Sequence, residues 1–506
     1  MSNKKKYHRG RREEKKPHLS NAAKRKLEQE KKQSKGLGQF IGKVICIIQL
    51  MVTIGFGILL WHSGLMPNKY LIPILVALFV LFGITFGLQF LRNKGYIVGI
   101  ILSVIISLLL SYGIYSLSSA NKFLKDVSGA KYKTDNMVAV VLTDDPAKSI
   151  EDAKDYTFGT QTTTDIENTK KMVKEMEKEL GSAITIKEYD NIQELGAAIL
   201  NKEVDSGIYN ESMSGILQET VEGYDGATRV LYQYGIHTEV EEQQPADVTK
   251  PFSIFISGID VSGPISTNSR SDVNIIMTVN PQTKKILLTT TPRDYYVTIP
   301  EVSGSARDKL THAGIYGVDA SIRTLENLYG IDIAYYARVN FDSVIKIVDV
   351  VGGVDVNSEE AFTTTIDGYN IQQGMNHLNG KQTLAFVRER YNVAGGDNQR
   401  GLNQQKVITA ILQKMMTPSM IVQVDSLLSS VEGSFETNMT HEEMQKLIKT
   451  QINSGLDFDI QSVAATGTGG SDVCFSTGTQ PLYVTYPDEN SINEIKAQLN
   501  EIIGNN

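Results

Sequence analysis

The sequence is poor in cysteine and lacks repeats. Its 506 residues include two cysteines, too few for a disulfide framework or a cysteine-rich metal site. No internal repeat or low-complexity tract is present. Hydrophobic residues make up 41% of the chain and charged residues 21%, which is ordinary for a folded protein and excludes global disorder. At about 150 residues per domain, this length predicts about three domains.

Charge is distributed unevenly along the chain. Residues 1–36 carry 14 Lys or Arg against 4 Asp or Glu, whereas the remainder carries 36 against 53. A basic tail therefore precedes an acidic body. We interpret the tail as a juxtamembrane segment that contacts anionic lipid. A nucleic-acid-binding tail is the alternative, but interleaved aromatic residues and a recognisable DNA-binding module are missing, so we expect no nucleic-acid partner.

Three long runs contain no Lys, Arg, Asp or Glu. They are 18, 22 and 20 residues long and occupy residues 44–61, 70–91 and 96–115. A helix rises about 1.5 Å per residue and the hydrocarbon core is about 30 Å thick, so each run can span a membrane. Buried core helices are the alternative, although uncharged runs of this length are rare in soluble domains. A cleaved signal peptide is disfavoured, because more than 40 residues precede the first run and no small-residue cleavage site follows it.

The placement of Lys and Arg predicts the orientation of these helices. The basic tail would stay in the cytoplasm, as would the short loop that holds Arg92 and Lys94. Residues 118–506 would then lie on the outer face of the membrane. Cys46 would lie in the membrane and Cys474 outside it, so we expect them not to pair. The predicted organisation is a basic tail at 1–40, three transmembrane helices at 41–117, an accessory domain at 132–245 and a larger domain at 252–506.

Strand and helix patterns alternate in both outer domains. In the accessory domain, strands are expected at 137–143 and 183–189, a helix at 164–181, and a helix followed by a strand within 191–210. In the larger domain, strands are expected at 252–259, 273–280, 285–291 and 335–340, and helices at 316–328, 341–350, 399–416 and 440–452. The predicted fold class is α/β: three N-terminal transmembrane helices, a small α/β accessory domain and a larger mixed α/β domain with a central sheet.

Charged residues gather at the ends of the predicted strands of the larger domain. Asp260 follows the first strand, where α/β sheets usually place ligands. Arg270 and Asp272 are two residues apart at the mouth of the next strand, so in an extended chain both point to one side. Arg293 follows the third strand. These residues are therefore expected near one edge of the sheet.

A second group of polar residues lies further along the chain. Arg388 and Arg390 are also two residues apart and share one face. The stretch GGDNQRGLNQQ opens a helix, in which Asp397, Arg400 and Gln404 share a face. If both groups converge, their carboxylates and guanidiniums suit a divalent cation with a pyrophosphate, because Mg²⁺ prefers one or two carboxylates plus phosphate oxygens, and Arg grips phosphate through a planar fork. For any single residue, a surface ion pair is the alternative.

Seven motifs follow one another in the larger domain. They are SGIDVSG (257–263), NSRSDVNIIMTVNP (268–281), TTTPRDYYV (289–297), KLTHAGIYG (309–317), RVNFDSVIKIVDVVGGVDV (338–356), FVRERY (386–391) and GGDNQRGLNQQKVI (395–408). In order and spacing they resemble the LytR-CpsA-Psr family, specifically its streptococcal capsule-type members. The resemblance covers nearly the whole chain, from the basic tail to the larger domain.

The resemblance implies a Mg²⁺-dependent phosphotransferase, with Mn²⁺ as an alternative ion. Such an enzyme moves a glycopolymer, here expected to be capsular polysaccharide, from a polyprenyl-pyrophosphate carrier to peptidoglycan through a phosphodiester, with pyrophosphate hydrolysis as a side activity. The implied partners are the lipid-linked polymer, peptidoglycan, the membrane and other capsule assembly proteins. The implied catalytic residues are Asp272, Arg270 and Asp260, of which Asp260 and Asp272 would bind the metal. The implied pyrophosphate-binding residues are Arg270, Arg293, Lys309, Arg388, Arg390, Asp397, Arg400 and Gln404.

Some assignments stay open at this point. Asn403 stands where many relatives carry Arg, so we do not count it as a phosphate ligand. His312 is either a general base or a structural residue, and Asp272 is a rival base. A non-catalytic module that binds lipid-linked polymer and regulates capsule assembly or export is the alternative function. A transcriptional regulator that acts through the basic tail is a second alternative.

Overall fold

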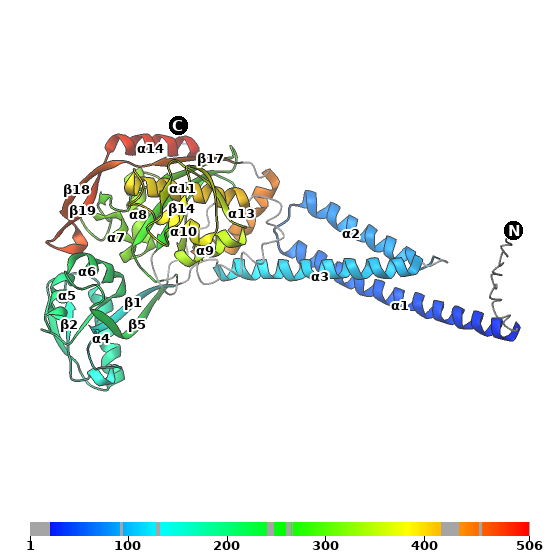
Figure 1. The fold of residues 1–506 in the computed structure, drawn as a ribbon, viewed down its shortest axis with the longest axis horizontal. Coiled ribbons are helices and arrows are strands. Elements are labelled where there is room, and N and C mark those ends of the chain that lie inside the picture. The colour runs from blue at the N-terminus through cyan, green and yellow to red at the C-terminus, as the bar shows by residue number, and fades with distance from the viewer. Residues whose placement is uncertain are drawn as a thin grey trace, which may run out of the picture. The chain divides into compact units, whose positions relative to one another are not determined.

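The structure, a computed structural model, describes most of the chain in two compact units (Figure 1). One unit holds helices α1 and α2 and the part of α3 up to Leu117, and the other holds Ser63–Pro67 and the chain from Ser118 onward. The residues described are 21–91, 95–127, 132–239, 247–259, 265, 267–415, 435–454 and 458–504.

Three long helices dominate the first unit, and they confirm the helices predicted from the uncharged runs. Their bounds are Asn21–His62 (α1), Asn68–Leu88 (α2) and Gly95–Val127 (α3). In each helix, the apolar part is long and apolar enough to cross a membrane. Thr85 Oγ1 donates to Gln49 Oε1 at 2.8 Å, and Cys46 Sγ lies 3.3 Å from Ser103 Oγ. Small polar groups therefore join the helices where apolar packing alone gives little specificity.

Residues 132–239, which we call the small-sheet region, form a five-stranded sheet in the order β3-β2-β4-β1-β5. β1 pairs antiparallel with β4 and β5, and β2 pairs parallel with β3 and β4. The strands are Tyr132–Leu142 (β1), Thr157–Gln161 (β2), Thr185–Tyr189 (β3), Ser206–Asn210 (β4) and Thr228–Glu239 (β5). The helices are Ile166–Leu180 (α4), Ile192–Leu200 (α5) and Ser214–Thr220 (α6).

Sequence patterns predicted β1, β3, β4, α4 and α5 of this sheet but not β2 or β5. β2 is five residues long and includes Gly159, which weakens a strand pattern. β5 is an edge strand whose side chains are mostly half-exposed, so its polarity does not alternate cleanly. Both strands form because their neighbours supply hydrogen-bond partners that no local pattern reveals.

Residues 247–504, the large-sheet region, surround a six-stranded sheet in the order β16-β11-β6-β7-β8-β17. β6 pairs parallel with β11, as β8 does with β17, whereas β7 runs antiparallel to β6 and β8. The carboxyl ends of β6, β8, β11 and β17 therefore meet the amino end of β7 at one edge. The strands are Phe252–Ile259 (β6), Ser271–Asn280 (β7), Lys285–Thr290 (β8), Tyr335–Asn340 (β11), Phe435–Thr437 (β16) and Asp459–Ala464 (β17).

Helices cover both faces of this sheet (Figure 1). Phe255 and Leu287 pack against α8 and α14, whereas their neighbours Ile254 and Leu288 pack against α11 and α13, as the two-residue period of a strand requires. α9 and α10 add a further core with α11. The helices are Leu310–Ala313 (α7), Val318–Tyr329 (α8), Phe341–Val350 (α9), Gly380–Arg388 (α10), Gly396–Met415 (α11), His441–Ser454 (α13) and Glu489–Ile503 (α14).

Short strands complete the region and the predicted mixed α/β class is confirmed. The predicted helices at 316–328, 341–350, 399–416 and 440–452 correspond to α8, α9, α11 and α13. The short strands are Tyr296–Val297 (β9), Asp308–Lys309 (β10), Val354–Ser358 (β12), Phe362–Thr363 (β13), Asn370–Ile371 (β14), Gly374–Leu378 (β15), Gly467–Val473 (β18) and Pro481–Pro487 (β19).

Candidate functional site

The candidate site lies at the edge where β6 and β8 end and β7 begins. Arg270 directly precedes β7, Asp272 is the second residue of that strand, and Arg293 lies in the turn that follows β8. The antiparallel pairing of β7 with β8 brings Asp272 and Arg293 together. Asp260 follows β6 in the chain but lies outside the described residues.

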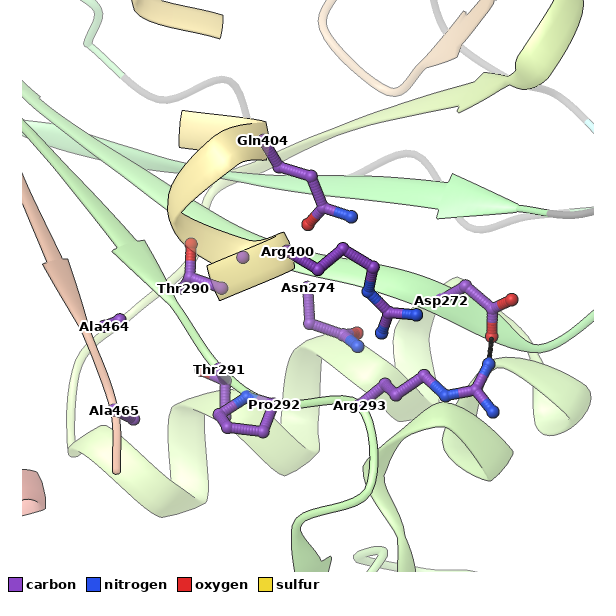
Figure 2. A pocket seen from close by; sticks show the side chains of 11 residues that line it. Asp272, Asn274, Thr290, Thr291, Pro292, Arg293, Arg400, Gln404, Ala464 and Ala465 are labelled. Carbon is purple, nitrogen blue, oxygen red and sulfur yellow. Dashed lines mark hydrogen bonds and ion pairs between the residues drawn. The ribbon is translucent and has the colours of Figure 1, made fainter. Parts of the chain in front are cut away.

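Two donors hold the carboxylate of Asp272. Arg293 Nη1 donates to Asp272 Oδ1 at 2.8 Å (Figure 2), and Thr311 Oγ1 donates to the same oxygen at 3.1 Å. The N–H of Thr311 in turn donates to the carbonyl of Arg293 at 2.8 Å. The sequence motifs did not single out Thr311, because a threonine at a short helix has no distinctive spacing. The three residues form one closed network at the mouth of the sheet.

All five predicted arginines line one cavity of about 290 Å³. They come from four parts of the large-sheet region and comprise Arg270, Arg293, Arg388, Arg390 and Arg400. The carboxylates in the described lining are Asp272 and Glu389, so positive charge prevails. The structure therefore brings together the arginines that sequence spacing predicted as two separate groups.

A second, smaller hollow adjoins Asp272 and Arg293. Figure 2 shows Arg400 extending from α11 toward the Asp272–Arg293 pair, with Gln404 on the same side of the helix. This agrees with the prediction that Arg400 and Gln404 share a helical face. Convergence of two guanidiniums on one carboxylate leaves a surplus of positive charge, which favours an anionic ligand.

α11 lies unusually close to β8. A Cβ at Gly401 would lie 2.8 Å from Cγ2 of Thr290, so a side chain there would push the helix away. Gln404 Nε2 also donates to the carbonyl of Val387 at 3.3 Å, which ties α11 to α10. These contacts fix the start of α11, and with it Arg400, over the edge of the sheet.

Glu389 fixes the turn that presents Arg388 and Arg390. Arg388 ends α10, and Oε1 of Glu389 then accepts hydrogen bonds from the N–H groups of Arg390, Tyr391 and Asn392 at 3.0, 2.8 and 3.0 Å. Burial raises the pKa of Glu389, but these and other backbone donors outweigh it and lower the pKa below its ordinary value. Sequence reasoning missed this residue, because a carboxylate between two arginines is typical of a surface ion pair. The position of Glu389 between Arg388 and Arg390 in FVRERY is the sequence signal that could have identified it.

Lys309 and His312 are buried away from the cavities. Lys309 Nζ pairs with Glu219 Oε1 at 2.9 Å and Asp294 Oδ1 at 3.5 Å, and its side chain is 3% exposed. His312 is fully buried, with Nδ1 2.6 Å from Asp308 Oδ1. Neither belongs to the described lining of the two cavities, so the placement does not support direct contact of Lys309 with a pyrophosphate. The burial of His312 favours its structural interpretation.

Asp397 and Asn403 are two further polar residues of α11. Asp397 belongs to the first turn of α11, but its side chain lies outside the described atoms. Asn403 is fully buried and accepts a hydrogen bond from Gln399 Nε2 at 3.1 Å. Burial of its amide inside the helix packing agrees with not counting Asn403 as a phosphate ligand.

Asp272 suits a metal that takes most of its ligands from a substrate and water. Within the described residues, Oδ1 is occupied by Arg293 and Thr311, whereas Oδ2 accepts no hydrogen bond. The described ranges contain no group of three or more His, Cys, Asp or Glu that would form an all-protein cage. Mg²⁺ is usually held by one or two carboxylates plus phosphate oxygens, so this donor set fits Mg²⁺.

Comparison with known proteins identifies the family. The LytR_cpsA_psr family model matches residues 218–501, more than half of the chain. The chain belongs to the LytR-CpsA-Psr family. The resemblance noted in the sequence motifs is thereby confirmed for the family, and the matched residues include every arginine of the cavity.

Several members of the LytR-CpsA-Psr family are similar to this chain. A Bacillus licheniformis protein named polyisoprenyl-teichoic acid–peptidoglycan teichoic acid transferase TagU is 33% identical over 253 residues, which are 50% of this chain and 78% of that protein. An Enterococcus faecalis protein of the same name is 33% identical over 255 residues, covering 49% and 79%. The crystal structure of Bacillus subtilis TagV matches with a TM-score of 0.43 and 27% identity, over 51% of this chain and 98% of TagV.

Proposed function

We propose that this protein transfers a glycopolymer from a polyprenyl-pyrophosphate carrier to peptidoglycan. The observation that carries the proposal is the convergence of five arginines and Asp272 on one cavity in a chain of the LytR-CpsA-Psr family. The similar proteins from B. licheniformis and E. faecalis are named as transferases that act on a polyisoprenyl-linked polymer and peptidoglycan, which supports the same reaction class here.

In the proposed reaction, a peptidoglycan hydroxyl attacks the phosphorus next to the polymer sugar. A new O–P bond forms, the bond to the bridging oxygen breaks, and polyprenyl phosphate leaves as the hydroxyl proton is lost. Arg270, Arg293 and Arg400 would orient the pyrophosphate through planar forks and offset the charge on the leaving phosphate. Arg388 ends α10 and Arg390 lies in the turn that follows. Both would bind the pyrophosphate from this second part of the cavity lining. In phosphoryl transfer a protein mainly positions groups and stabilises charge, which this lining suits.

Asp272 and Asp260 are the residues that we propose for holding Mg²⁺, with Mn²⁺ as the alternative. When bound there, the ion would supply Lewis-acid stabilisation of the negative charge that develops on the phosphate. The Oδ2 atom of Asp272 supports this assignment, since no described residue donates to it. We also propose hydrolysis of the pyrophosphate, with water in place of the sugar hydroxyl, as a side activity of the same site.

Capsular polysaccharide is the polymer that we propose, and other capsule assembly proteins are proposed partners. The support is the resemblance of the whole chain, since the similar transferases named for teichoic acid cover only about half of it. We propose further that the basic tail is cytoplasmic and that residues 118–506 lie outside, which would place the site on the side where peptidoglycan is found.

The proposal is tested with the full chain in detergent. The protein is given a short oligosaccharide on polyprenyl pyrophosphate, of either capsular or teichoic acid type, with peptidoglycan glycan chains and either Mg²⁺ or a chelator. Mass spectrometry should detect glycan joined to glycan through phosphate only with Mg²⁺, and more with the capsular donor. Asp272→Ala and Arg270→Ala should abolish transfer.

The matched control is Cys474→Ala, which should retain transfer. Cys474 is a fully buried free thiol outside the described cavity lining, and burial raises its pKa to about 12. Retained transfer in both Asp272→Ala and Arg270→Ala would contradict the site assignment. Tight donor binding without product, under several acceptors, would favour a non-catalytic module that binds lipid-linked polymer.

A further inference from the structure

A series of ion pairs links the small-sheet region to the candidate site. Glu219, near the end of α6, pairs through Oε2 with Arg270 Nη1 at 3.5 Å and through Oε1 with Lys309 Nζ at 2.9 Å. Lys309 also lies 3.5 Å from Asp294, whose Oδ2 is 3.7 Å from Arg293 Nε. This series of ion pairs thus begins at Arg270 and ends at Arg293, and both arginines line the cavity.

Gly215, one turn before Glu219 on α6, allows the guanidinium of Arg270 to pack against the helix backbone. A Cβ at Gly215 would lie 2.7 Å from Arg270 Cζ and 2.8 Å from its Nη2. The guanidinium therefore rests on the helix backbone itself, where a larger residue would displace it. Ile216 and Leu217 anchor α6 in the core of the small-sheet region, so the backbone that contacts Arg270 is held in place by packing.

The segment that carries Arg270 has a second attachment to the small-sheet region. Thr267 forms a parallel bridge with Thr134 of β1. Asn268 Nδ2 donates to Asp135 Oδ1 at 2.7 Å, and both side chains are buried. The backbone before Arg270 is thereby tied to β1, while its guanidinium is tied to α6.

We propose that Glu219 is a positioning residue, through which the small-sheet region completes the anion site by fixing the direction of Arg270. This inference rests on the proposed function and deepens it. Each carboxylate oxygen of Glu219 has its own cation, and the buried Lys309 prevents the carboxylate from turning away. An arginine that is ordered before the substrate arrives loses less conformational freedom on binding and keeps its fork aligned in the transition state.

The charge of Glu219 is maintained by the same contacts. Burial raises the pKa of Glu219, but the hydrogen bond and attraction from Lys309, followed by the other cations around it, outweigh burial and lower the pKa below its ordinary value. Removing this charge has two opposite effects on an anionic ligand. Arg270 loses its orientation, whereas the net positive charge of the site increases. Substrate affinity should therefore not fall, although the transfer step should slow.

The test measures kcat and KM for transfer by the full chain in detergent, in Glu219→Gln and in Gly215→Ala. Gly215→Ala leaves every charge intact and places a better helix former in α6, but displaces Arg270. Both variants should lower kcat about tenfold, because a misaligned group slows a positioned reaction, and Glu219→Gln should do so without a rise in KM. The matched control is Glu203→Gln, which removes an exposed carboxylate paired with Lys187 at 3.2 Å and should change neither parameter.

An Arg270→Lys background separates positioning from general destabilisation. Glu219→Gln and Gly215→Ala should lower kcat no further when Arg270→Lys is already present, because both act through the guanidinium. Losses that multiply in this background, a loss confined to KM, or wild-type kcat in both variants would overturn the role of Glu219 and leave the transferase proposal standing. Absence of transfer by the wild-type protein would overturn both. If thermal unfolding shows that Glu219→Gln does not fold, Gly215→Ala decides.

Discussion

Arg293 Nη1 lies 2.8 Å from Asp272 Oδ1, and this contact joins the end of β8 to the start of β7. The two side chains are 15% and 19% exposed, so the pair is shielded from bulk water yet reaches the cavity. One carboxylate oxygen is thereby committed to the protein. The carboxylate of Asp272 is held in a fixed direction, which a metal ligand or a group beside a pyrophosphate requires.

The hydroxyl of Thr311 is expected to contribute to that direction. Thr311→Val keeps the shape of the side chain and removes the hydrogen bond of 3.1 Å to Asp272. One such bond contributes about 1 kcal/mol, so kcat for transfer should fall about fivefold. The matched control is Thr324→Val in α8, whose hydroxyl donates to the carbonyl of Ala320. Equal effects of the two substitutions on kcat would contradict a role for Thr311 in holding Asp272.

Arg400 is expected to act through the shape of its guanidinium as well as its charge. Arg400→Lys keeps the positive charge at the cavity but loses the planar fork that binds two phosphate oxygens. The kcat/KM for transfer should fall by about tenfold or more, and a tenfold fall corresponds to about 1.4 kcal/mol of lost transition-state stabilisation. Arg323→Lys is the control, since Arg323 is a half-exposed residue of α8 paired with Glu301 outside the described cavity lining. Wild-type kcat/KM in Arg400→Lys would show that charge alone suffices.

Glu389 should contribute to stability in a pH-dependent manner. Glu389→Gln replaces an oxygen acceptor with an amide donor that faces backbone N–H groups, including that of Thr365. The free energy of unfolding should fall by about 1–3 kcal/mol. Thermal unfolding in detergent measures the effect, with the exposed Glu501→Gln as control.

The sign of the pH dependence follows from the lowered pKa of Glu389. A carboxylate with a lower pKa in the folded state stabilises the protein above its unfolded value of about 4.5, and this contribution is lost as the pH falls through the folded pKa. Glu389→Gln should therefore reduce the difference in stability between neutral pH and pH values below about 4.5. An unchanged difference would contradict the assigned role.

Sequence patterns predicted the arginine cavity better than the groups that hold it. Arg270, Arg293 and Arg400 stand out because they occur at a strand end, after a strand and at a helix start, and such positions meet at one sheet edge. Thr311 and Glu219 have no such signal. Their importance depends on which residue lies opposite them, and Glu219 comes from α6 of the small-sheet region.

The sequence by itself determined three membrane-length helices, the mixed α/β class, the family and the identity of the arginines that line the cavity. These properties follow from local patterns: uncharged runs, strand periodicity and motif order. Only the tertiary structure decided that Lys309 is buried between Glu219 and Asp294 and that Gly215 supports Arg270. Such contacts join residues distant in the chain, and their partners are set by the packing of α6 and β1 against the large-sheet region, because ion pairing and close approach depend on distance in space.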